Sequence, residues 1–372
     1  MGALRLFLAV SVLVRHLRYG RGVLGFSFLD GGLAVECFFV ISGFYMALVL
    51  HEKYNYRGSY GAFIQQRFLR LYPLYIIVGV VILVVEGLIT YSTSRPCGVY
   101  EYWSKEPHCV TFLSGCYYAL VNLAIVGLDS LWFLSQDGIT GQLYLTPYEV
   151  PHATPCFYYI VNGPSWTLAV EMTFYLLAPF LVRKSVKVQA AFMLVSLALR
   201  SAFYLAMDPK SSGPWTFHFS PSLLFFFMAG SLGYRFYTDN RAKLEKFAAG
   251  HTWIFWVIGI LMLLQGRLPY KDYFWYFFLP AAIVLVPLLF AYTRTNRTDR
   301  LIGELSYPYY LIHYHVIVVT EYFLHENHNS IFGPLCAVVT FGLAYLLYQF
   351  IETRTEHYRE RLFQKKLLVQ KS

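Results

Sequence analysis

The feature that most constrains this chain is a series of apolar runs, each about 17–22 residues long. A helix of that length crosses a hydrocarbon core of roughly 30 Å. Of the 372 residues, 57% are hydrophobic and only 14% are charged, and the mean hydropathy is +0.47. A β-barrel would show shorter segments of alternating polarity. The sequence therefore predicts an integral membrane protein built from helices.

We predict an all-α fold, a polytopic membrane helical bundle with about ten transmembrane helices. The expected spans are residues 3–19, 31–50, 72–91, 165–182, 186–206, 221–237, 253–268, 273–292, 305–324 and 331–351. An eleventh apolar segment, 112–128, is either a further span or a partly inserted helix in the long outward loop of residues 95–163. We expect one membrane domain over residues 1–351 and a charged cytoplasmic tail over 352–372.

The formal charge of +9 comes from Lys and Arg in short loops between apolar runs, so it predicts membrane orientation and not nucleic-acid binding. Ten spans with a cytoplasmic amino terminus place most of these residues inside. Eleven spans with the opposite orientation fit as well, so charge alone leaves the choice open.

The six cysteines fall into two groups. Four lie in or near the two long loops that ten spans would place in an oxidising compartment, where disulfides of unknown connectivity are plausible; these are Cys97, Cys109, Cys116 and Cys156. Cys37 and Cys336 fall inside predicted spans, where we interpret them as packing residues.

The first span carries two basic side chains, Arg5 and His16, eleven positions apart. On a helix they share one face, about 16 Å apart along the axis, and suit a ligand with an anionic end and a reactive end. The alternative for His16 is an interfacial basic cluster with Arg15 and Arg18. Glu36 in the second span either orients His16 or forms a structural ion pair with an arginine.

Arg67 and Arg70 are three positions apart on a helix that leads into the third span, so both project from one face. Two guanidinium groups on one face suit phosphate oxygens, although basic residues before a span also mark a cytoplasmic loop. Further along, Thr167, Glu171 and Tyr175 follow one another at a spacing of four. This stripe either poises a proton or binds a sugar hydroxyl; the alternative is a hydrogen-bond network between helices.

His313 lies within a late span and His315 on another face of the same helix. Taken singly, each histidine is more typical of a packed, hydrogen-bonded side chain than of a catalyst. The His, Cys and carboxylate residues lack the close spacing of a zinc site, so we predict no metal centre and no permanently bound cofactor.

Five of these stretches, in this order, resemble motifs of the integral-membrane acyltransferase family 3, whose bacterial members O-acylate envelope and secreted glycans. They are Arg5-x10-His16, Phe38-Phe-Val-Ile-Ser-Gly-Phe44 with Ser42, Arg67-x-x-Arg70 before Pro73, Trp166-Thr-Leu-x-x-Glu171 with Tyr175, and Leu305-Ser-Tyr-x-x-Tyr-Leu-x-His313. Thr167 replaces the usual Ser, and Glu36 stands where Asp is common. The resemblance covers most of the chain and favours the ten-span orientation.

The resemblance implies transfer of an acyl group, expected to be acetyl, from cytoplasmic acyl-CoA to a hydroxyl of an envelope or lipid-linked saccharide at the bacterial inner membrane. The implied catalytic residues are His16, Glu36 and Glu171, and the implied acyl-CoA-binding residues are Arg5, Arg67 and Arg70. Supporting roles fall to Ser42, Trp166, Tyr175 and His313. The alternatives are a secondary transporter that uses buried His and Glu as a proton relay, and an inactive glycan-binding or assembly partner.

Overall fold

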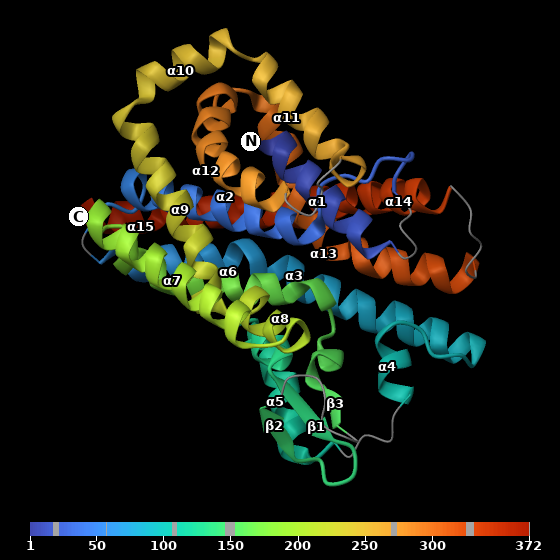
Figure 1. The fold of residues 1–372 in the computed structure, drawn as a ribbon. Coiled ribbons are helices and arrows are strands. Elements are labelled where there is room, and N and C mark those ends of the chain that lie inside the picture. Colours follow the sequence, from blue (N-terminus) through green and yellow to red (C-terminus); the bar gives the residue numbers. More distant parts are fainter. Residues whose placement is uncertain are drawn as a thin grey trace.

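The computed structural model describes residues 1–17, 22–56, 58–105, 110–145, 153–268, 274–324 and 331–371. Long helices dominate, and they lie side by side in a bundle (Figure 1). In chain order the helices are α1 (Gly2–His16), α2 (Gly31–Glu52), α3 (Ser59–Thr93), α4 (Val99–Lys105), α5 (Phe112–Ala124), α6 (Trp166–Leu181), α7 (Val186–Ala206), α8 (Pro209–Phe217), α9 (Ser220–Asp239), α10 (Arg241–Gly250), α11 (Trp253–Leu263), α12 (Phe274–Thr293), α13 (Arg297–Leu324), α14 (Phe332–Leu347) and α15 (Thr353–Lys371).

Each of the ten predicted spans falls on one of these helices, because long apolar runs favour helix even where, as in α6, α12 and α13, the run contains a proline. Helix α2 begins where the Asp30 carboxylate accepts hydrogen bonds from the backbone N–H groups of Gly32 and Leu33. Helix α3 is longer than expected: it runs unbroken through Pro73, so that Arg67, Arg70 and the apolar span form a single helix.

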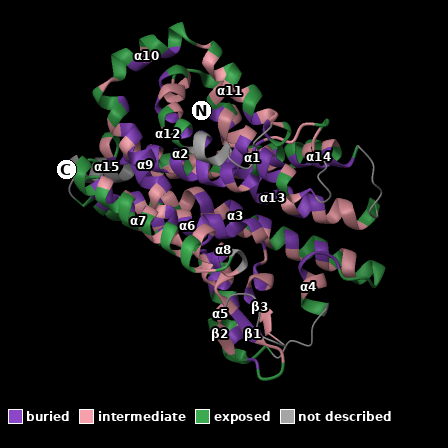
Figure 2. Cartoon of the chain, viewed as in Figure 1, coloured by how far each residue is buried: buried purple, intermediate pink, exposed green. Residues whose placement is uncertain are grey.

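The core of the bundle is formed by α1, α2, α9 and α13, whose buried residues stand out in Figure 2. Helix α1 packs against α2 and α13, and α2 packs closely on α9. Two glycines allow this approach. A Cβ added at Gly43 would lie 2.0 Å from the Phe227 carbonyl oxygen, and one at Gly230 would lie 1.9 Å from that of Val40. Small residues let membrane helices pack backbone to backbone in this way.

Four helical segments in the described residues are long and apolar enough to cross a membrane: Gly31–Glu52, Ser59–Thr93, Val186–Ala206 and Phe332–Gln364. A fifth is added if α10 and α11, which meet at a bend of 73°, count as one span. The expectation of about ten spans is thus not confirmed. Helix α1 has 15 residues and reaches about 22 Å, less than a hydrocarbon core. Long exposed apolar stretches on α3 and α7 nevertheless fit a membrane protein.

The long loop of residues 95–163 contains more regular structure than the sequence suggested. It holds α4, α5 and a small antiparallel sheet of order β2-β1-β3, formed by β1 (Leu134–Asp137), β2 (Leu143–Leu145) and β3 (Ala153–Pro155). Helix α5 and the sheet project from one side of the bundle (Figure 1). The all-α prediction is therefore corrected: the fold is mainly helical but also contains this three-stranded sheet. Helix α5 has 13 residues, which is too short to span a membrane as residues 112–128 might have done.

Five of the six cysteines are described, and all five are free. Cys97, Cys116 and Cys156 thus form no disulfide with one another, against the possibility raised by their place in the loops. Burial raises the pKa of the Cys97 and Cys156 thiols to about 11, so both are protonated at neutral pH. Cys109 lies outside the described residues. Cys37 and Cys336 are buried, as packing residues are.

The charged tail is a helix that packs back onto the bundle. A π-turn at Tyr348–Glu352 joins α14 to α15, and α15 contacts α3. The Gln66 side chain donates a hydrogen bond to the Arg359 carbonyl at 2.9 Å, and Phe363 packs against Tyr54 with ring centroids 5.4 Å apart. These contacts bring the guanidinium of Arg359 to the same end of the bundle as Arg67 and Arg70.

Candidate active site

Two cavities lie in the bundle and share a wall. We call the first the arginine cavity; it has a volume of about 640 Å³, and Arg5, Arg67, Arg70 and Glu171 are among the residues that line it. The second, the histidine cavity, has a volume of about 570 Å³ and is lined by His16, Trp166 and His315 among others. Val35 and Tyr310 line both, so the cavities lie end to end along α1.

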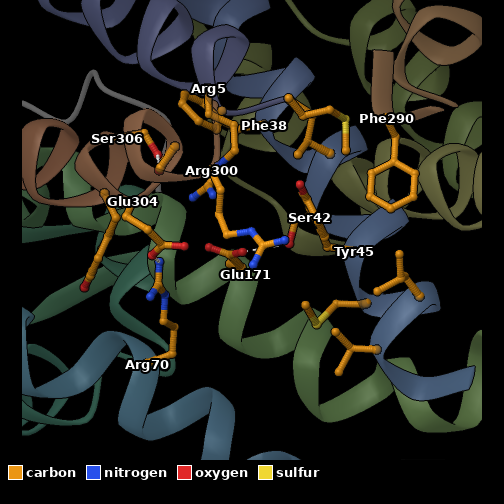
Figure 3. Close-up of a pocket in the computed structure, with 18 of the residues that line it drawn as sticks. Arg5, Phe38, Ser42, Tyr45, Arg70, Glu171, Phe290, Arg300, Glu304 and Ser306 are labelled. Carbon is orange, nitrogen blue, oxygen red and sulfur yellow. Dashed lines mark hydrogen bonds and ion pairs between the residues drawn. The ribbon is translucent and has the colours of Figure 1, made fainter. Parts of the chain in front are cut away.

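Six arginines line the arginine cavity: Arg5, Arg67, Arg70, Arg294, Arg300 and Arg359. The acidic residues of its lining are Glu52, Glu171, Asp299, Glu304 and Glu356. Side chains from α1, α3 and α13 enter this space, as Figure 3 shows for Arg5, Arg70 and Arg300. Within the described chain, four of these guanidinium groups have no acidic partner within 4.0 Å, namely Arg5, Arg67, Arg300 and Arg359.

Arg67 and Arg70, predicted as a pair, have different surroundings. Arg70 donates to Glu304 at 2.6 Å, and a second carboxylate, Glu352, lies 3.9 Å away. The guanidinium of Arg67 lies 5.8 Å from the Phe63 ring centroid, and its Nε atom is buried without a partner in the described structure. Arg67 is therefore the better placed of the two to bind an incoming anion.

Glu171 stands at the centre of a hydrogen-bond network in the arginine cavity. The Ser42 hydroxyl donates to its Oε1 atom at 2.7 Å, and the Tyr175 hydroxyl donates to the same oxygen. Figure 3 shows Ser42 beside Glu171. The predicted stripe of Glu171 and Tyr175 on α6 is thus joined to Ser42 of the second-span motif on α2. In this position the carboxylate faces the cationic cavity and not His16.

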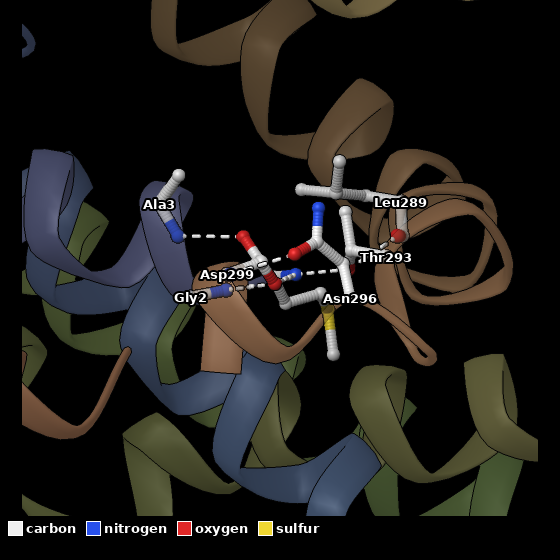
Figure 4. A network of polar contacts seen from close by, with 7 residues as sticks. Gly2, Ala3, Leu289, Thr293, Asn296 and Asp299 are labelled. Atoms are coloured by element: carbon white, nitrogen blue, oxygen red, sulfur yellow. Dashed lines mark hydrogen bonds and ion pairs between the residues drawn. The ribbon is translucent and has the colours of Figure 1, made fainter. Parts of the chain in front are cut away.

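The start of α1 is fixed by Asp299 at the start of α13 (Figure 4). The Asp299 carboxylate accepts hydrogen bonds from the backbone N–H groups of Gly2 at 2.8 Å and Ala3 at 2.9 Å, and pairs with the ammonium group of Met1 at 2.6 Å. Carboxylates stabilise a helix amino terminus in this way. The contact fixes the first turn of α1 and with it the position of Arg5 in the cavity.

His16 reaches the histidine cavity from the far end of α1. Its ring packs 5.3 Å from that of His313 and 5.2 Å from that of Tyr314, measured between centroids. His313 is fully buried beside it, and its Nδ1 atom bonds to the Tyr310 carbonyl at 2.6 Å. The interfacial alternative for His16 is not needed, because its ring lines a cavity inside the protein.

An aromatic wall forms another side of the histidine cavity. The rings of Trp132 and His218 stack 3.8 Å apart, with Phe157 on Trp132 at 4.5 Å and Trp166 against His218 at 4.2 Å. Burial lowers the pKa of His218 to about 3, so it is neutral and acts as an aromatic surface. Trp166, predicted from its motif, therefore belongs to an apolar platform beside His16.

Tyr310 forms part of the wall between the two cavities. Its hydroxyl lies 3.0 Å from the Thr167 hydroxyl and 3.2 Å from the Pro164 carbonyl, and its ring packs on Phe38 with centroids 6.0 Å apart. Thr167 itself donates to the Pro164 carbonyl at 3.0 Å. Thr167, which replaces the usual serine, thus holds the Tyr310 ring between the two cavities through its hydroxyl group.

Glu36 is placed differently from our preferred expectation. Its carboxylate pairs with Arg200 of α7, which is the structural alternative, and it is absent from the described lining of both cavities. Sequence reasoning also missed Arg300 and Arg359, which come from the first turn of α13 and from the tail. Their charge was visible in the sequence, but nothing local showed that they line the same cavity as Arg67.

Comparisons with known proteins identify the family of this chain. A family profile described as an acyltransferase domain, the third acyltransferase family, matches residues 1–349. The acyltransferase MdmB of Streptomyces mycarofaciens is 28% identical over 193 residues, which is 49% of this chain and 39% of that protein. The chain thus covers well under half of this relative's length. No solved structure gives a significant match. Since the profile covers nearly the whole sequence, this chain belongs to acyltransferase family 3.

Proposed function

We propose that this protein is a multi-pass membrane O-acyltransferase. It moves an acyl group, acetyl in the first instance, from cytoplasmic acyl-CoA to a hydroxyl of an envelope or exported glycan at the bacterial inner membrane. Membership of an acyltransferase family supports acyl transfer as the reaction class. The donor and the acceptor are those that the family resemblance implies, and the two cavities support them.

The observation that carries the proposal is the pair of cavities on either side of Tyr310. One holds guanidinium groups that have no acidic partner among the described residues, and such groups suit the phosphates of a coenzyme A thioester. The other holds an imidazole beside aromatic rings, which suit the flat apolar face of an acceptor next to a base. In this proposal the pantetheine arm follows α1 from Arg5 toward His16.

His16 then works in one of two ways. As a general base it takes the proton of the acceptor hydroxyl, an effect typically worth about 10²–10⁴-fold. As a nucleophile it accepts the acyl group and passes it on, which would give ping-pong kinetics. Glu171, held by Ser42 and Tyr175, lies in the arginine cavity, where we assign it to proton transfer at the donor end. An orienting role for Glu36 remains a prediction.

Mass spectrometry of envelope polysaccharides from cells with and without the gene tests the function. We expect an added acyl mass on a saccharide only when the gene is present. Identical glycan masses in the two strains would count against the glycan acceptor. Proteoliposomes separate the transporter alternative: movement of a solute with no consumption of thioester would favour transport.

A further inference from the structure

A carboxylate–imidazole pair lies beside the histidine cavity, and neither member is used by the mechanism above. The Nδ1 atom of His315 on α13 lies 2.7 Å from Oε1 of Glu86 on α3. Both side chains are buried, with 1% of Glu86 and 7% of His315 exposed. The two residues are 229 positions apart in the sequence, so only the fold brings them together.

Glu86 is held at both oxygens. Its second oxygen, Oε2, accepts the backbone N–H of Val99 at 2.8 Å. The residue before, Gly98, has a φ of 59° and lies against the carboxylate, where an added Cβ would be 2.0 Å from Oε2. A glycine is required there both by the positive φ and by the close approach. The carboxylate is therefore held in position by the Val99 backbone independently of its contact with His315.

This contact sets the state of the His315 ring. Since Nδ1–H donates to the carboxylate, the neutral ring has its lone pair on Nε2. That Nε2 atom is buried and has no hydrogen-bond partner in the described structure. His315 lines the histidine cavity together with His16 and Tyr314, whereas Glu86 lies behind it. The ring thus presents a basic nitrogen on the side away from its carboxylate.

His16 lacks such support. Its neighbours in the described chain are the rings of His313 and Tyr314 and the adjacent cation Arg15, and no carboxylate pairs with it. An imidazole that takes a proton becomes a cation, and a buried carboxylate on its other nitrogen stabilises that cation and fixes the tautomer. Of the three histidines in the described lining of this cavity, His16, His218 and His315, it is His315 that pairs with a carboxylate.

We propose that His315, and not His16, is the general base for the acceptor hydroxyl, and that Glu86 is its positioning residue. His16 then has the second of the two roles given above, that of the nucleophile. This inference rests on the proposed function and deepens it. The Nε2 atom takes the hydroxyl proton while the oxygen forms a bond to the acyl carbon. The bond from that carbon to the His16 nitrogen breaks, and its electron pair returns to that nitrogen; the thiolate sulfur has already left, with its own electron pair, when His16 took the acyl group. The thiolate is protonated by water, and His315 returns its proton to solvent.

The test uses the full-length protein in lipid nanodiscs, acetyl-CoA as donor, and two acceptors. One is the saccharide that the parent acetylates; the other is hydroxylamine, a strong nucleophile that needs no base. The main variant is His315→Asn, whose amide keeps a donor for Glu86 but lacks the basic nitrogen. We expect transfer to the saccharide to fall by about 10²–10⁴-fold, with an unchanged KM for acetyl-CoA. Transfer to hydroxylamine should stay within a few fold, and added imidazole should restore part of the saccharide reaction.

Glu86→Gln supplies a second test and should act in the same direction with a smaller loss. The control is His51→Asn, because His51 is a half-buried histidine of the same bundle and is absent from the described lining of both cavities. Saccharide transfer within threefold of the parent in His315→Asn would overturn the inference. An equal loss of transfer to the saccharide and to hydroxylamine, in either variant, would also overturn it, because a pair with a purely structural role would affect the two acceptors alike. If the parent itself transfers acetyl to no hydroxyl, the proposed function fails instead.

Discussion

Arg67 offers the sharpest test of the donor site, because its guanidinium lines the arginine cavity without an acidic partner in the described residues. A charge-assisted hydrogen bond contributes about 1.5–3 kcal/mol. At 1.36 kcal/mol per tenfold change, Arg67→Ala should raise the KM for acetyl-CoA by about 10- to 150-fold. Because Arg67 lies in the arginine cavity and outside the described lining of the histidine cavity, kcat should change much less.

The assay measures initial rates of labelled acetyl transfer over a range of acetyl-CoA concentrations. Arg67→Lys should give an intermediate KM, since it keeps the charge but loses the planar fork of donors. Arg241→Ala is the control for loss of one positive charge, because Arg241 is exposed and pairs with Glu245 at 3.0 Å. Repeating the series with dephospho-CoA thioester shows whether the 3′-phosphate is the group that is bound. A KM within twofold of the parent in Arg67→Ala would refute the phosphate assignment.

Three further predictions follow from the site. Arg70→Met should lower the free energy of unfolding by about 2–4 kcal/mol, because it leaves the carboxylate of Glu304 without its partner at 2.6 Å. The double variant with Glu304→Gln should recover part of this loss, as measured by thermal denaturation. Tyr310→Phe removes the hydroxyl that contacts Thr167, so it should lower the free energy of unfolding by about 1 kcal/mol. It should also increase hydrolysis of the thioester in the absence of acceptor, measured as released thiol, because the Tyr310 ring is held less firmly between the two cavities. An unchanged rate of hydrolysis would argue against Tyr310 as a barrier to water. Trp132→Ala should raise the KM for the acceptor by about 2- to 12-fold and leave that for acetyl-CoA unchanged, and the reverse pattern would move the acceptor site elsewhere.

The helices were the part of the fold that the sequence predicted best. Apolar runs indicate where the long helices lie, and residues 186–206 were predicted with the bounds that α7 has. The number of membrane crossings was harder, because a helix buried among other helices can be short or carry polar residues. The small sheet was missed because its strands have three or four residues, too few to show an alternating pattern.

The candidate site was predictable where chemistry lies in local motifs. Spacing placed Arg5 and His16 on one face of α1, and it aligned Glu171 with Tyr175. Pairings between distant helices could not be predicted from the sequence, because several arginines or histidines are candidate partners for each buried carboxylate. Glu36 meets Arg200 and Glu86 meets His315, and both choices depend on how α2, α3, α7 and α13 pack.

The central claim is that the histidine cavity is where acyl transfer takes place. The most direct measurement is transfer of labelled acetyl from acetyl-CoA to the acceptor saccharide by purified His16→Ala protein, beside the parent and His251→Ala, whose substituted histidine is exposed. We predict that the parent and His251→Ala transfer label at equal rates, and that His16→Ala loses the reaction while still binding acetyl-CoA. A His16→Ala protein that transfers label at the parent rate would contradict the account.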